Sequence, residues 1–123
     1  MRRERHLSRR AVLIFSALVM GWVVARSAGA DDANDATYLR YHRAINAEAT
    51  CKHRDFGPSD DTRMASYIEG KVHHRIGPDR RVTLIEQARL EVDQLVEQRG
   101  CDSAAIKELL TVFDVELAPL LAE

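Results

Sequence analysis

The residues of this chain whose types and spacing could do chemistry are two cysteines and a few histidines. In the stretch "EATCKHRDFG", residues 48–57, Cys51 lies two positions before His53 and within a basic run. A cysteine so placed could be half of a metal site, an activated thiol or one end of a disulfide. The compartment of the protein, and the elements that position the cysteines, decide between these roles.

The first 30 of the 123 residues differ in kind from the rest. Five arginines within residues 1–10 precede an apolar run at residues 11–25, and small residues then lead to Ala30. This order is typical of a secretory signal peptide, with cleavage expected after Ala30. The apolar run is shorter than the roughly 20 residues that a membrane span needs, although an uncleaved anchor is the alternative. Residues 8–13 partly match a twin-arginine signal, so the Sec and Tat routes both stay open.

The charge of the remaining part, residues 31–123, limits its partners. The whole chain has 18 basic and 19 acidic residues, of which the leader contains six arginines and one glutamate, so its removal leaves a net charge of −6. We expect a single domain, periplasmic or secreted, that binds neither nucleic acid nor an anionic membrane surface and has no stable membrane span after cleavage.

Export favours the disulfide among the roles of Cys51. An even number of cysteines in an exported protein is typical of paired thiols, and the only intramolecular pairing is Cys51 with Cys101. The bond closes a loop of about 50 residues, which stabilises a folded chain by about 4 kcal/mol.

Other chemistry lacks its sequence motif. Glu69 and His73 are spaced to share a helix face, yet no H-E-x-x-H pair accompanies them, and the cysteines form no C-x-x-C. The run His73–Arg75 is more simply a solvated helix end. Nucleophile elbows and phosphate-binding glycine loops are absent from the sequence. We therefore expect a protein that is not an enzyme and has neither a metal nor a cofactor.

Apolar residues at spacings of three and four predict four amphipathic helices. Asp35 is the expected N-cap of the first, Ser59 of the second, and Thr83, in a capping box with Glu86, of the third. The expected helices cover about residues 35–49, 60–76, 83–99 and 103–119. The predicted fold is an all-α bundle of four short helices stapled by one disulfide, after an N-terminal signal peptide.

The fourth helix carries the most apolar face, and we expect this stripe to bind a protein. Ordinary core packing is the alternative explanation. The residues of the stripe are Ile106, Leu109, Leu110, Phe113 and Leu117.

The leader, the two cysteines and the four short helices together resemble the periplasmic acid-stress chaperones of the HdeA/HdeB type. The segment "VDQLVEQRGC" at the end of the third helix runs into the second cysteine, as the resemblance requires. The chain departs from the family in its basic residues after Cys51, in the lack of tryptophan after residue 30 and in its apolar, acidic end. The resemblance implies a folded or dimeric state at neutral pH that loosens in acid and exposes apolar surface to unfolding clients.

Two functions therefore remain. The first is a small exported, non-enzymatic protein that binds protein clients under acid stress, with a homodimer left open. The alternative is an interaction or accessory subunit that docks on a larger bacterial envelope complex through its fourth helix.

Overall fold

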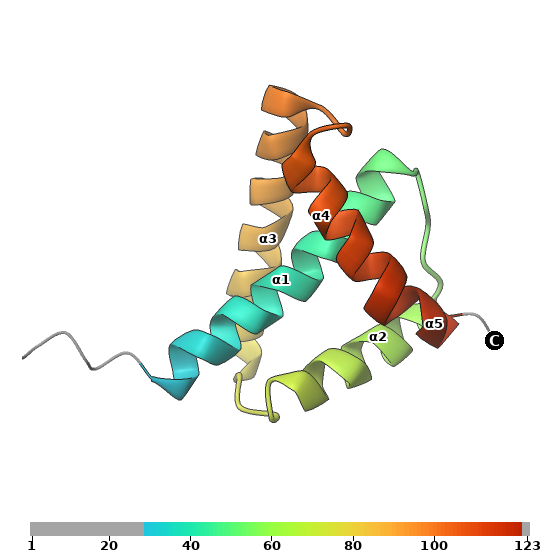
Figure 1. The fold of residues 1–123 in the computed structure, drawn as a ribbon. Coiled ribbons are helices and arrows are strands. Elements are labelled where there is room, and N and C mark those ends of the chain that lie inside the picture. The colour runs from blue at the N-terminus through green and yellow to red at the C-terminus, as the bar shows by residue number, and fades with distance from the viewer. Residues whose placement is uncertain (1–28, 122–123) are drawn as a thin grey trace, which may run out of the picture.

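A computed structural model describes residues 29–121 and is helical, without strands, over that range (Figure 1). The expected signal peptide lies outside the described residues except for Gly29 and Ala30. None of the helices within residues 29–121 is long and apolar enough to cross a membrane. The helices are α1 (Ala30–Cys51), α2 (Pro58–Lys71), α3 (Pro78–Arg99) and α4 (Ala104–Val112), and α4 continues into the π-helical turn η2 (Phe113–Leu117) and into α5 (Ala118–Leu121).

Helix α1 is the central element of the fold. It passes through the middle of the molecule and packs against α2, α3, α4 and η2, while α5 contacts α2 (Figure 1). The main core contains Tyr38, Tyr41, Met64, Ile68, Val72, Leu84, Phe113 and Leu117. A smaller core near the disulfide contains Ala47, Val92 and Ile106. The predicted all-α bundle of four helices stapled by one disulfide is confirmed.

Helix α1 begins five residues before the expected N-cap, Asp35. Its N-cap is Gly29, and Asp31 and Asp32 occupy the first turn, where the helix dipole favours acidic side chains. Asp35 lies inside the helix and forms an ion pair with Arg80 of α3, at 2.5 Å between oxygen and nitrogen.

Helix α2 ends at Lys71, so the prediction that it extends to Ile76 is wrong. His73 and His74 follow in the left-handed region, with φ of 58° and 53°. The backbone N–H of His74 donates to the Glu69 carbonyl at 2.9 Å, which closes the turn. Val72 and Ile76 are nevertheless buried, since the turn folds them back onto the core.

Helix α3 begins at Pro78, so the predicted capping box at Thr83 is also wrong. Gly77 is the N-cap, and proline fits the first helical position because its fixed φ is helical and its missing N–H has no partner there. Thr83 lies inside the helix, where its hydroxyl donates to the Asp79 carbonyl at 3.2 Å. Leu84 of α3 is fully buried, whereas its neighbour Ile85 is 40% exposed.

Helix α4 begins as expected, because the Ser103 hydroxyl accepts a hydrogen bond from the Ile106 N–H at 3.3 Å. The π-helical turn comes just before Pro119, which has no N–H to donate to the carbonyl four residues earlier and whose ring crowds it. Widening the helix by one residue relieves this conflict. The turn also directs Glu116 towards α1 and α2.

Two neighbouring substitutions test the register of α3, that is, which of its faces points towards the core. We expect Leu84→Ala to lower the free energy of unfolding by about 3 kcal/mol, since it leaves a cavity in the core. Ile85→Ala serves as the matched control and should cost less than about 1 kcal/mol, because that side chain is partly exposed. Urea unfolding of the disulfide-bonded proteins measures both values. A larger cost for Ile85→Ala would contradict the register.

Candidate functional site

The disulfide joins Cys51, the last residue of α1, to Cys101 in the corner between α3 and α4. The two Cα atoms are 5.7 Å apart. The predicted pairing is confirmed, and with both thiols oxidised neither can act as a nucleophile or a metal ligand. His53, two residues after Cys51, is exposed. Within residues 29–121 no three histidine, cysteine, aspartate or glutamate side chains gather as metal ligands would.

The predicted binding stripe lies mostly inside the protein. Ile106, Phe113 and Leu117 are 0% exposed and belong to the two cores. Leu109 and Leu110 are partly buried against the smaller core. In this state three of the five side chains therefore face other helices, and a binding role for them requires the segment from α4 to α5 to move away from α1. That role stays a prediction.

One carboxylate connects this C-terminal segment to two other helices. Glu116 of η2 accepts hydrogen bonds from Tyr41 of α1 at 2.5 Å, from Tyr67 of α2 at 3.0 Å and from Arg40 of α1 at 2.9 Å. The two tyrosine rings meet edge to face, with centroids 5.8 Å apart. We call these four residues the Glu116 cluster. It is the polar counterpart of the apolar contacts that Phe113 and Leu117 make from the same turn.

The charge of Glu116 is stabilised by its neighbours. The hydrogen bond from Tyr41 lowers the pKa of the Glu116 carboxyl most, burial opposes this shift, and the bonds from Tyr67 and Arg40 lower the pKa further. Burial, together with the adjacent carboxylate, raises the pKa of Tyr41. Because the folded-state pKa of Glu116 lies below 4.5, its contribution to stability is present above pH 4.5 and is lost as the pH falls through the folded-state value.

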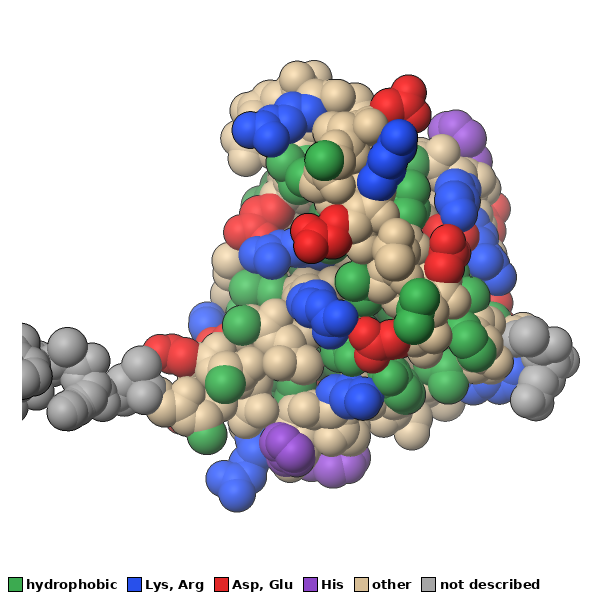
Figure 2. Space-filling view, in the orientation of Figure 1, with side chains coloured by type: hydrophobic (Ala, Val, Ile, Leu, Met, Phe, Trp, Pro, Cys, Tyr) green, Lys and Arg blue, Asp and Glu red, His purple; other side chains and the backbone are tan. Residues whose placement is uncertain are grey.

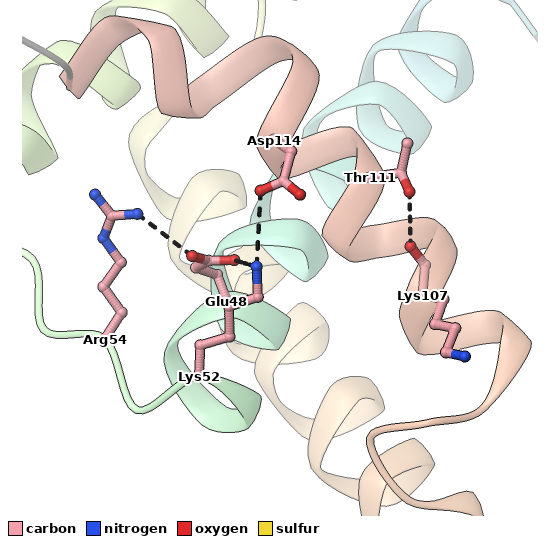
Figure 3. A network of polar contacts seen from close by, with 6 residues as sticks. All are labelled: Glu48, Lys52, Arg54, Lys107, Thr111 and Asp114. Carbon is pink, nitrogen blue, oxygen red and sulfur yellow. Dashed lines mark hydrogen bonds and ion pairs between the residues drawn. The ribbon is translucent and has the colours of Figure 1, made fainter.

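A second carboxylate, that of Glu48, lies in the last turn of α1, with Arg54 and Lys52 directed towards it (Figure 3). Glu48 is 3% exposed, and its oxygens lie 3.3 Å from the Arg54 guanidinium and 3.5 Å from the Lys52 ammonium. Lys52 also lies 3.8 Å from Asp114 of η2. We call these four residues the Glu48 cluster. Oxygen Oε1 of Glu48 accepts no hydrogen bond among the described residues, so the cluster is incompletely satisfied.

Neither cluster was predicted from the sequence. Glu48 and Glu116 look like ordinary solvated positions on amphipathic helices, and their partners lie on other elements. The one available signal was the set of tyrosines with apolar spacing, since a buried tyrosine hydroxyl needs a hydrogen-bond partner. Tyr41 and Tyr67 therefore implied a polar group inside the bundle without saying which one.

A shallow groove of about 390 Å³ separates α3 from α4. Leu95, Ala105 and Leu109 give it an apolar part, so one residue of the predicted stripe reaches the surface here. The remaining lining is polar and includes Arg43 and Glu91, which pair at 2.6 Å. The face that carries α4 accordingly shows acidic and basic side chains interspersed with small apolar areas (Figure 2).

Comparison with known proteins adds no identification. No family model, curated protein or solved structure matches this chain. The case for its function therefore rests on its own residues, above all on the two carboxylate clusters and on the apolar side chains beneath them.

The contribution of the Glu116 cluster to stability can be measured by removing the charge of Glu116. We expect Glu116→Gln to lower the free energy of unfolding at neutral pH by about 1 to 2 kcal/mol, since three donors lose a charged acceptor that is partly screened by solvent. Glu108→Gln is the control, because Glu108 is exposed on α4 and forms no ion pair within residues 29–121. Equal losses in the two variants, measured by urea unfolding, would show that the cluster has no special role.

Proposed function

We propose that this protein is a small exported, non-enzymatic protein that binds unfolding protein clients when acid opens it, as its resemblance to the HdeA/HdeB type implies. The observation that carries the proposal is the Glu116 cluster. One ionised carboxylate connects the segment from α4 to α5 with both α1 and α2. Protonation of Glu116 weakens all three hydrogen bonds together, because a neutral carboxyl is a poorer acceptor.

The segment released in this way carries the predicted binding stripe. Ile106, Phe113 and Leu117 are fully buried by the contacts that would be lost. Exposed together, they form an apolar surface of the kind that marks protein-binding sites. The disulfide at Cys101 keeps the start of α4 next to the end of α1, so that opening does not become complete unfolding.

A histidine in α1 adds a second acid-sensitive step at higher pH. Burial lowers the pKa of His42 from 6.5 to about 4, and its ring centroid lies 4.5 Å from that of Tyr38. The unfolded chain therefore gains a proton first as the pH falls, and the folded state loses stability between pH 6.5 and 4. The full loss is at most about 3 kcal/mol, which is a large fraction of the stability of a small domain.

The change in net charge in acid also favours opening. Acid neutralises the carboxylates after residue 30 and leaves Lys, Arg and His charged, so the net charge changes from negative to strongly positive. Self-repulsion of a cationic chain favours the open state and keeps it soluble. Both effects support opening in acid rather than at neutral pH.

The role of His42 can be tested through the slope of stability against pH. We expect His42→Gln to remove about 2 to 3 kcal/mol of the stability change between pH 6.5 and 4, whatever its effect on absolute stability. His73→Gln is the matched control, since His73 is exposed in the turn after α2. Urea unfolding at several pH values measures the slope. If His42→Gln leaves the slope of the wild type unchanged, His42 does not contribute.

The proposed function itself is tested by client aggregation. The disulfide-bonded protein should suppress the aggregation of an acid-denatured client at a pH of about 3, where carboxylates are largely protonated, and should do so far less at neutral pH. Light scattering follows the aggregation. The absence of suppression at every pH would reject the proposal.

A further inference from the structure

The linker between α1 and α2, residues 52–57, crosses the surface as a single extended segment (Figure 1). None of the backbone N–H groups of residues 53–56 donates a hydrogen bond within the described part of the chain. His53 has a φ of 53°, a left-handed conformation that costs a non-glycine residue about 1 kcal/mol. The linker is therefore weakly stabilised by its own backbone.

Besides Lys52, which pairs with the Glu48 carboxylate at 3.5 Å, two side chains attach this linker to the body of the protein. The guanidinium of Arg54 lies 3.3 Å from the buried Glu48 carboxylate, and its central carbon is 5.5 Å from the ring centroids of both Phe56 and Phe113. Phe56 packs on Phe113, with ring centroids 5.8 Å apart. An arginine and an aromatic ring two residues later thus contact a buried carboxylate and a core phenylalanine.

We propose that the linker covers a binding site for client segments, and that its own Arg54 and Phe56 show which chemistry the site accepts. The site consists of the Glu48 carboxylate and the ring of Phe113. Its ligand is an extended segment of an unfolded protein in which a basic residue lies two positions from an aromatic residue. The ligand identity rests on the proposed client-binding function, whereas the displacement of the linker does not.

The incomplete satisfaction of Glu48 is the reason a client can compete. Its Oε1 atom is buried and accepts no hydrogen bond among the described residues, and its ion-pair partner, the Lys52 ammonium, lies 3.5 Å away. A client arginine that binds in a bidentate way can donate hydrogen bonds to both carboxylate oxygens of Glu48, which Arg54 does not. The linker thus leaves a buried acceptor that a better ligand would satisfy.

The ends of the linker allow it to move without unfolding the helices. Cys51 is fixed by the disulfide at one end. At the other end the Gly57 N–H donates to the Asp60 carboxylate at 3.3 Å, and α2 begins there. Segments with few buried contacts and few backbone hydrogen bonds open at low cost. Opening the linker would uncover Phe113 while α1 and α2 remain folded.

A peptide with the sequence of the linker tests the site at neutral pH. The probe is acetyl-Lys-His-Arg-Asp-Phe-Gly-amide, and the protein is the disulfide-bonded double variant Arg54→Ala, Phe56→Ala. NMR titration should show binding at least about tenfold tighter than to the wild type, where the tethered linker competes at an effective concentration in the millimolar range. The control variant, Arg75→Ala with Val115→Ala, changes an exposed arginine and an exposed apolar residue elsewhere and should bind like the wild type.

Variants of the probe and of the site identify the contacts. Replacing either the arginine or the phenylalanine of the peptide by alanine should weaken binding about tenfold. Adding Glu48→Gln to the double variant Arg54→Ala, Phe56→Ala, which we call the emptied protein, should have the same effect. Equal binding of all three peptides would overturn the proposal, as would binding to the emptied protein no tighter than to the control variant.

The wild type gives a measurement that does not depend on the folding of any variant. Saturating peptide should shift the ring resonances of Phe56 and Phe113 together, because the phenylalanine of the peptide takes the place of Phe56 on the ring of Phe113. Unchanged ring resonances at saturation would overturn the proposal.

Client aggregation separates this site from the proposed function. Peptide binding without suppression of aggregation at any pH would uphold the site and reject the client-binding function. Suppression by the wild type at about pH 5, where carboxylates are still largely ionised, that is unaffected by saturating peptide would uphold the function and reject this site as the place where clients bind.

Discussion

The covalent bond between Cys51 and Cys101 is the constraint on which the rest of the structure depends. It fixes the end of α1 to the turn between α3 and α4. The disulfide therefore anchors both the central helix and the start of the C-terminal segment. The core beside this bond contains only Ala47, Val92 and Ile106 as fully buried side chains. A small core needs such a covalent link, and the link in turn permits the contacts farther along the chain to be weaker.

Those weaker contacts are divided between apolar and ionic partners. Phe113 and Leu117 bury their side chains in the main core, while Glu116, in the same turn, depends on an ionised carboxylate. The apolar contacts respond little to pH, whereas the carboxylate loses its charge in acid. The C-terminal segment therefore combines an apolar surface with a pH-dependent contact that keeps it covered, and the proposed function follows from this combination.

The sequence was sufficient for the fold class and for the disulfide, because these follow from local spacing and from the number of cysteines. It was misleading at the starts and ends of helices. Thr83 has the residues of a capping box, yet Pro78 begins the helix earlier, and the helix expected to reach Ile76 stops before two left-handed histidines. The clusters around Glu48 and Glu116 could not be predicted, because most of their partners come from other elements. No local sequence pattern distinguishes these two glutamates from solvated glutamates on a helix surface.

We propose that acid detaches the segment from α4 to α5 while the disulfide and the helices it joins persist. Amide hydrogen exchange of the oxidised protein, corrected for intrinsic rates, tests it most directly. Protection factors within residues 104–121 should fall at least about tenfold below pH 4.5, while those in the middle of α1 and α3 stay high. Loss of protection in all helices at the same pH, or in none of them, would contradict it.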